Sequence, residues 1–233
     1  MDKRIGRFTS SEIFNLLKKD KAGTGFGKPA LSYIAEKKYE KKLGRYLDNE
    51  TNNKYCDWGK FIEQMAFDNL SIEYSLVSDQ TIVHWLIDSW AGTPDLLKND
   101  DTVCDIKCPF TLKSFCQLYE CTDKESLISS HKDGEKYYWQ LVSNAILTNR
   151  DKAELIVYCP YLEDLDNIRD QAGLAGIKWL EHASDDCLPW LDTDSAYNNI
   201  HIISFDISDD DKNLLTDAVL LASETLRKSK CIL

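Results

Sequence analysis

The order of strand-like and helix-like segments constrains this fold most. Apolar strand patterns are predicted at residues 71–77, 81–88, 102–107, 153–158 and 200–205. Amphipathic helices are predicted to begin near Thr9 and Pro29 and to span 58–70, 135–149, 164–181 and 209–228. Because the helices outnumber the strands and separate most of them, we expect an α/β fold with a central mixed β-sheet flanked by α-helices.

Composition indicates a single domain that spans residues 1–233. The chain is 43% hydrophobic, which is enough for a full core, and no Pro/Gly/Ser-rich linker divides it. The N-terminus lacks an apolar signal segment, and no apolar run approaches the roughly 18 to 20 residues of a membrane helix. We therefore expect a soluble cytoplasmic protein without membrane contact. Its eight cysteines include no Cys-x-x-Cys pair, so we expect most of them to be small buried apolar residues; they are residues 56, 104, 108, 116, 121, 159, 187 and 231.

Charge is distributed unevenly along the chain. The net charge of -11 argues against a nucleic-acid partner, because phosphate binding normally uses a basic surface. However, lysine and arginine are concentrated in residues 1–60, whereas aspartate and glutamate dominate residues 161–217. Two interpretations stay open: the basic part contacts a polyanion, or it is a lysine-rich helix face in solvent.

Two acids and a lysine lie close together between Gly92 and Phe110. Asp95 follows a proline, and Asp105 and Lys107 are two residues apart in the predicted strand 102–107. Since side chains alternate along a strand, Asp105 and Lys107 point to one face while Ile106 points into the core. Carboxylates with a backbone carbonyl are the hard oxygen ligands that Mg2+ prefers, and a nearby lysine is suited to holding a water molecule beside a phosphodiester.

Two further polar residues are candidates for the same site. Glu63 lies beside the apolar stripe of the helix 58–70, and Gln140 shares a helix face with Tyr137 and Asn144. Glu63 is a candidate for a supporting or second metal site, and Gln140 for positioning Lys107 or the attacking water. The alternatives are ordinary: a solvated glutamate, a surface amide and a chance Asp-x-Lys.

The motifs together resemble the PD-(D/E)XK nuclease superfamily, specifically the phage lambda exonuclease and YqaJ-like viral recombinase family. Trp58-Gly59-Lys60-Phe61-Ile62-Glu63 resembles the family's Trp-Gly-Lys-x-x-Glu helix. Thr93-Pro94-Asp95 resembles its Ser-Pro-Asp, and residues 105–111 resemble its Glu-x-Lys-Cys-Pro-Phe-Thr, with aspartate for glutamate at Asp105. Gln140 falls where the family has a glutamine. The resemblance implies a restriction-endonuclease-like core.

The resemblance also implies roles for individual residues. Asp95, Asp105 and the Ile106 carbonyl would bind metal with support from Glu63, and Lys107 would activate water. We expect Mg2+ as the cofactor, replaceable by Mn2+, with two ions per site. Arg4, Ser11 and Thr93 match the family's pocket for a DNA 5'-phosphate, although threonine replaces serine at Thr93. An arginine and a hydroxyl at a helix start are suited to phosphate binding.

The resemblance implies a Mg2+-dependent 5'-to-3' exonuclease that leaves 3' single-stranded overhangs on double-stranded DNA for phage-type homologous recombination. Its expected partners are DNA ends, a single-strand annealing protein and, in a ring-shaped homotrimer, further copies of the chain. A phage origin would place it in the host cytoplasm. The alternatives are a PD-(D/E)XK endonuclease or another DNA repair or defence nuclease, and a catalytically silent DNA-binding module. The segment 163–199 has no assigned role.

Overall fold

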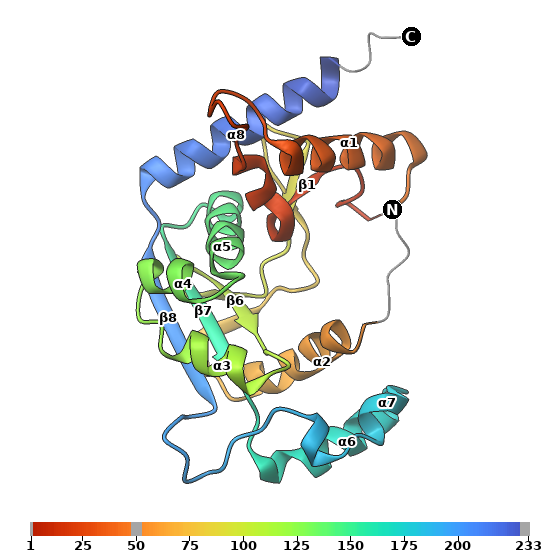
Figure 1. Cartoon of the computed structure of the whole chain (residues 1–233), viewed down its shortest axis with the longest axis vertical. Helices are drawn as coiled ribbons and strands as arrows, with labels where there is room; N and C mark the ends of the chain where they lie inside the picture. The colour runs from red at the N-terminus through yellow and green to blue at the C-terminus, as the bar shows by residue number, and fades with distance from the viewer. Residues whose placement is uncertain (1, 48–52, 229–233) are drawn as a thin grey trace.

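A mixed five-stranded sheet forms the centre of the molecule. The computed structural model describes residues 2–47 and 53–228. The strand order is β2-β5-β6-β7-β8; β6 and β7 are parallel, and the other neighbours are antiparallel. The strands are β2 (Tyr74–Leu76), β5 (Leu96–Lys98), β6 (Thr102–Lys107), β7 (Lys152–Tyr158) and β8 (Ile200–Asp206). The α/β fold with a mixed sheet flanked by helices is therefore confirmed (Figure 1).

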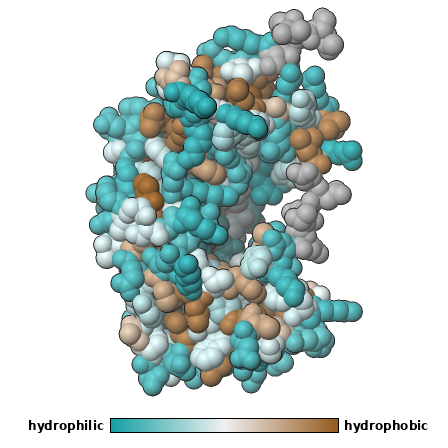
Figure 2. Space-filling model, viewed as in Figure 1, coloured by the Kyte–Doolittle hydropathy of each residue, from teal (hydrophilic) through white to brown (hydrophobic). Residues whose placement is uncertain are grey.

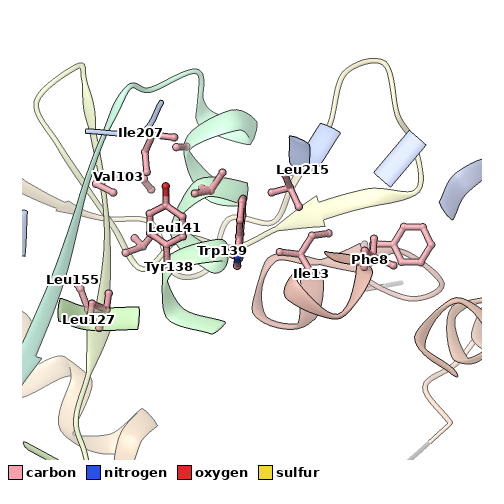
Figure 3. Packing of buried hydrophobic residues seen from close by; sticks show 14 of the residues in the cluster. Phe8, Ile13, Val103, Leu127, Tyr138, Trp139, Leu141, Leu155, Ile207 and Leu215 are labelled. Carbon is pink, nitrogen blue, oxygen red and sulfur yellow. The ribbon is translucent and has the colours of Figure 1, made fainter. Parts of the chain in front are cut away.

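Helices cover both faces of this sheet, so its central strands are apolar on both sides. Val103 of β6 packs in one core cluster with residues of α5 (Gly134–Thr148) and α8 (Asp209–Lys228), part of which is drawn in Figure 3. Its neighbours Cys104 and Ile106 belong to a second cluster with α2 (Lys54–Asp68) and α6 (Leu165–Leu174). The alternation along β6 thus sends successive side chains into different cores, and Ile106 is buried as predicted.

A second, three-stranded sheet leads directly into the Thr-Pro-Asp motif. Its order is β1-β4-β3, with β1 (Phe8–Thr9) parallel to β4 (Trp90–Gly92) and β3 (Ile82–Val83) antiparallel to β4. The chain continues from β1 into a 3-10 helix, η1 (Ser10–Leu17), and then into α1 (Lys28–Leu43), which has Pro29 in its first turn as expected. Thr93 follows β4 directly.

The parallel pair β6 and β7 requires a long crossover, which three helices supply. They are α3 (Leu112–Tyr119), α4 (Lys124–Ser130) and α5. Thr111 caps α3 by accepting a hydrogen bond from the Ser114 N–H, at 3.2 Å. Asp123 and Ser126 form a reciprocal capping box at the start of α4. These caps fix where the crossover turns before α5 packs on β6.

Several predicted elements differ from the structure. The predicted strand 81–88 contains only β3, and β4 and β5 were not expected. The predicted helix 164–181 is broken into α6 and α7 (Lys178–Glu181), because Gly176 adopts a left-handed conformation with φ 74°. The predicted strand 71–77 shortens to β2, and α3 and α4 were missed.

Two findings concern the membrane segment and the cysteines discussed from composition. Over the described part of the chain, no helix has the length and apolar character to cross a membrane. Cys104, Cys121 and Cys159 are buried as expected, whereas Cys56 and Cys187 are exposed. Cys231 lies outside the described residues.

Candidate active site

Side chains from four separate segments meet at the C-terminal end of β6. Asp105 and Lys107 come from β6 itself, and Asp95 lies immediately before β5. Glu63 is provided by α2 and Gln140 by α5, two helices that pack against β6 from opposite faces (Figure 1). The five residues predicted to form the catalytic site therefore converge. Their convergence depends on the antiparallel pairing of β5 with β6. This pairing places Leu96 opposite Cys104, and so brings the preceding Asp95 beside Asp105.

Asp105 lies at the centre of this group and is fully buried. Its Oδ1 accepts a hydrogen bond of 2.5 Å from Gln140 Nε2. Its Oδ2 forms an ion pair with Lys107 Nζ but has no hydrogen-bond partner of good geometry. Gln140 was predicted to position Lys107 or a water molecule; in the structure it instead orients Asp105. A buried carboxylate oxygen without a hydrogen bond is costly, so a cation bound there would relieve it.

Asp95 and Glu63 add two more carboxylates. Asp95 Oδ2 accepts a hydrogen bond of 2.8 Å from the Ile106 N–H, which ties the Thr-Pro-Asp turn to β6. Burial, followed by the negative charge of Asp105, holds the pKa of Asp95 well above its usual value. Burial and Asp105 likewise raise the pKa of Glu63. Three acids crowded in a low-dielectric site favour protonation unless a cation compensates their charge.

Lys107 supplies one such positive charge. Burial by itself lowers the pKa of Lys107, but Asp105 and Asp95 raise it above the ordinary lysine value overall. Its Nζ also lies 5.2 Å from the centre of the Tyr137 ring, within the range of a cation–π contact. Tyr137 in turn stacks on His131, with ring centres 5.6 Å apart. The contribution of Tyr137 was not predicted, although its spacing of three residues from Gln140 on α5 was the signal that could have found it.

The donor set fits a hard divalent cation. Carboxylate oxygens and a backbone carbonyl suit Mg2+, and one or two carboxylates suffice because this ion keeps several waters. Three carboxylates, those of Glu63, Asp95 and Asp105, crowd around the ammonium of Lys107, and this excess of negative charge is the observation that favours a further cation here. Among the described residues, no three His, Cys, Asp or Glu side chains already enclose a metal position. Asp95, Asp105 and Glu63 are therefore candidate ligands, but their carboxylates are not already arranged around one metal position in the described structure.

The three residues predicted to bind a 5'-phosphate do not all come together. Arg4 and Thr93 line one pocket of about 690 Å3, which also contains Thr81. The Thr93 hydroxyl lies 3.1 Å from Thr81 Oγ1, and the Arg4 guanidinium is paired with Asp2 at 2.9 Å. Within the described residues, Ser11 is not among those lining this pocket; its hydroxyl lies 3.5 Å from Thr9 Oγ1.

The surface is hollowed between the part of the molecule that carries α1 and the part that carries α2 (Figure 2). Hydrophilic residues cover most of the face in that view. Part of the positive charge of residues 1–60 is neutralised by internal ion pairs: Lys37 is buried against Glu36 and Glu40, and Lys18 pairs with Glu135 at 2.5 Å. The separation of charge in the sequence therefore overstates the free positive surface.

Solved exonuclease structures share this fold. The alkaline exonuclease LHK-Exo from Laribacter hongkongensis matches with a TM-score of 0.60 and 16% identity, covering 97% of this chain and 93% of that one. LHK-Exo in complex with dAMP matches with a TM-score of 0.63 and 18% identity over 97% and 90%. A phage-related exonuclease from Haemophilus somnus 129PT matches with a TM-score of 0.62 and 14% identity, covering 95% of this chain and 94% of that one.

No family model matches the chain, and no curated protein matches its sequence. At these identities the structural similarity establishes the fold. The fold predicted from the motifs, that of the phage-type exonucleases, is confirmed on this basis.

Proposed function

We propose that this protein is a metal-dependent deoxyribonuclease that degrades double-stranded DNA from its ends in the 5'-to-3' direction. One observation carries the proposal: Glu63, Asp95, Asp105, Lys107 and Gln140 converge at the end of β6. The fold shared with the exonucleases supports placing this chemistry on DNA. The product would be a 3' single-stranded overhang, as strand-annealing recombination requires.

Each side chain then has a role. Asp95, Asp105 and the Ile106 carbonyl would hold Mg2+, or Mn2+ in its place, and Glu63 would complete this site or hold a second ion. When bound, the metal neutralises charge on the phosphodiester and lowers the pKa of water. Gln140 fixes the carboxylate plane of Asp105 through its hydrogen bond.

Lys107 is cationic in the structure, because Asp105 and Asp95 outweigh the effect of its burial on its pKa. A charged ammonium donates hydrogen bonds and orients a water molecule or a phosphate oxygen. A lysine that exchanges its ion pair with Asp105 for a contact with water would lose the interaction that raises its pKa. Lys107 then becomes available to orient and activate water.

Recognition of a DNA end would involve the pocket of Arg4 and Thr93, which Ser11 does not line. A terminal phosphate would have to displace Asp2 from Arg4, so a doubly charged 5'-phosphate competes better than an internal phosphodiester. Comparing 5'-phosphorylated with 5'-hydroxyl duplexes tests this part. Faster digestion of the phosphorylated duplex supports it, and equal rates contradict it.

The test of the catalytic proposal is digestion of a linear 5'-phosphorylated duplex with Mg2+ by the wild type and by Lys107→Ala. We expect the variant to lose at least about 100-fold in rate, as is usual for removal of a positioned proton-transfer group. Lys152→Ala is the matched control: Lys152 lies at the other end of the sheet, is exposed, and pairs with Asp101. Undiminished digestion by Lys107→Ala would refute the proposed role.

Substrate geometry distinguishes the alternatives. A covalently closed plasmid should stay intact with an exonuclease, whereas an endonuclease cuts it. The products should carry 3' single-stranded tails that a single-strand annealing protein can bind. A homotrimer should give three times the 26.7 kDa chain mass in light scattering.

A further inference from the structure

Two large apolar side chains project from the tip of the β3–β4 hairpin. Trp85 is 85% exposed and Leu86 is 70% exposed, although both closely follow the half-buried strand β3. Exposed tryptophan at this level is unusual, because its ring carries a large apolar area that folding normally removes from water. The hairpin tip is therefore a candidate for contact with another molecule.

The Trp85 ring is anchored to the core by a column of aromatic rings. It stacks on His84, with ring centres 6.4 Å apart and planes 18° from parallel. His84 stacks on Trp90 at 5.0 Å and 4°, and Trp90 is fully buried. Trp90 is fixed by a hydrogen bond of 2.9 Å from its Nε1 to Ser143 on α5. The exposed ring is the outer member of an ordered stack.

Backbone hydrogen bonds hold the tip in this shape. His84 Nδ1 accepts the N–H groups of Leu86 at 3.2 Å and of Ile87 at 3.1 Å. Trp90 N–H in turn donates to the Ile87 carbonyl at 3.0 Å. Burial lowers the pKa of His84, in keeping with an uncharged ring that accepts at Nδ1. Ordering Trp85 on binding therefore costs little conformational entropy.

Two basic side chains, Arg7 and Lys41, lie beside Asp88 of the hairpin loop despite the net charge of -11. Arg7 Nη2 pairs with Asp88 at 2.7 Å, and its Nη1 donates to the carbonyl of Lys3 at 2.6 Å. Lys41 of α1 lies against Gly6, and its charge helps to lower the pKa of Asp88, after the larger effect of the Arg7 hydrogen bond. Lys41 is exposed. Arg7 and Lys41, two cations beside the single acid Asp88, suit a polyanionic partner.

We propose that Trp85 is a stacking platform for an unpaired DNA base, with Arg7 and Lys41 beside the adjoining phosphates. Aromatic stacking with basic side chains is the usual mode of single-strand binding. Trp85 is at the closed end of the hairpin, and Thr93, two residues before Asp95, directly follows its open end. The platform and the candidate active site are therefore connected by the same hairpin.

This inference rests on the proposed function, because digestion of one strand at a DNA end leaves the bases of the retained strand unpaired. Trp85 would receive a base of that strand as it leaves the duplex. The interaction would not depend on base identity, since every base presents a π-face.

The experiment measures binding of a fluorescein-labelled oligo(dT) by anisotropy in EDTA, which prevents metal-dependent hydrolysis. Trp85→Ala should weaken binding roughly 5- to 150-fold, the range for loss of one base–aromatic stack. Trp85→Phe should retain most of the affinity. Leu86→Ala is the matched control, because it removes a neighbouring exposed apolar side chain but no ring, and it should bind like the wild type.

Three results separate the possibilities. Unchanged affinity in Trp85→Ala, with an unchanged circular dichroism spectrum, overturns the platform even if the wild type digests DNA normally. Trp85-dependent binding by a wild type that hydrolyses no DNA supports the platform and removes the proposed function alone. If Trp85→Ala and Leu86→Ala both weaken binding equally and both lower the mass in light scattering, the tip is a contact between copies of the chain, and the proposal is overturned.

Discussion

Gly92 allows the closest approach between the second sheet and the helices that support the site. A Cβ atom at this position would lie 2.1 Å from Ser10 Oγ, 2.6 Å from Asn144 Oδ1 and 2.6 Å from Leu147 Cδ1. All three distances are far below van der Waals contact, and the neighbours belong to η1 and α5. Gly92→Ala must therefore displace β4 or these closely packed side chains of η1 and α5.

The expected cost follows from overpacking. Inserting a methyl group into a closely packed site typically costs about 1 to 3 kcal/mol. For a chain of this length, each kcal/mol lowers Tm by about 2 to 4 °C, so Gly92→Ala should melt roughly 2 to 12 °C below the wild type. Because Thr93 and Asp95 follow Gly92, we also expect slower DNA digestion.

Gly59→Ala is the matched comparison, since the chemical change is the same. Gly59 lies within α2, and a Cβ there would meet no atom within 4 Å. Replacing a helical glycine by alanine stabilises by about 0.5 to 1 kcal/mol, so its Tm should rise by roughly 1 to 4 °C. Thermal melts followed by circular dichroism measure both. A Gly92→Ala protein that melts at or above the wild-type temperature would refute the packing argument.

Three further predictions follow from other contacts. Asp95→Asn removes one of three crowded acid groups, so in EDTA it should stabilise the fold by about 1 to 2 kcal/mol and raise Tm by roughly 2 to 8 °C while abolishing digestion; a lower Tm in EDTA contradicts this. Tyr137→Leu should reduce kcat more than KM because the ring that holds Lys107 is lost, whereas Tyr137→Phe should retain activity; equal rates for both exclude a role of the ring. Burial raises the pKa of Asp211, but hydrogen bonds from Lys124 and other donors lower it overall, so its stabilising effect is present above pH 3.8 and is lost as pH falls through the lowered value. Asp211→Asn should therefore lose less Tm than the wild type between pH 5 and pH 3, and an identical loss would contradict this linkage.

Local sequence patterns predicted the site better than they predicted its surroundings. The alternation in residues 102–107 fixes which side chains of β6 share a face, and this pattern requires no knowledge of the partner strand. The long helices at 135–149 and 209–228 repeat their apolar residues over several turns, so tertiary contacts did not override them. These two kinds of pattern place Asp105, Lys107 and Gln140.

The short elements depend on distant partners. β4 has three residues and exists because β1, more than 80 positions earlier, pairs with it at Phe8 and Trp90. No local pattern encodes that pairing. By contrast, Gly176 was a visible signal for the break between α6 and α7, and the prediction of one continuous helix over 164–181 did not take it into account. The position of Ser11 outside the pocket of Arg4 and Thr93 likewise depends on side-chain placement that spacing does not determine.

The register of β6 against β7 has a consequence for how activity first appears. Asp105 pairs with Leu155 and Ile106 with Ile156. A shift by one residue would turn Asp105 and Lys107 into the apolar cluster of α2 and would bring Ile106 to the acids. The pairing that is thermodynamically favoured is thus also the pairing that assembles the acids. Because the paired residues of the two strands are 50 positions apart, their closure is a late, non-local event in folding. If the proposed function holds, a refolding chain should recover its secondary structure before its nuclease activity, and a newly made chain should be silent towards DNA until its sheet is complete.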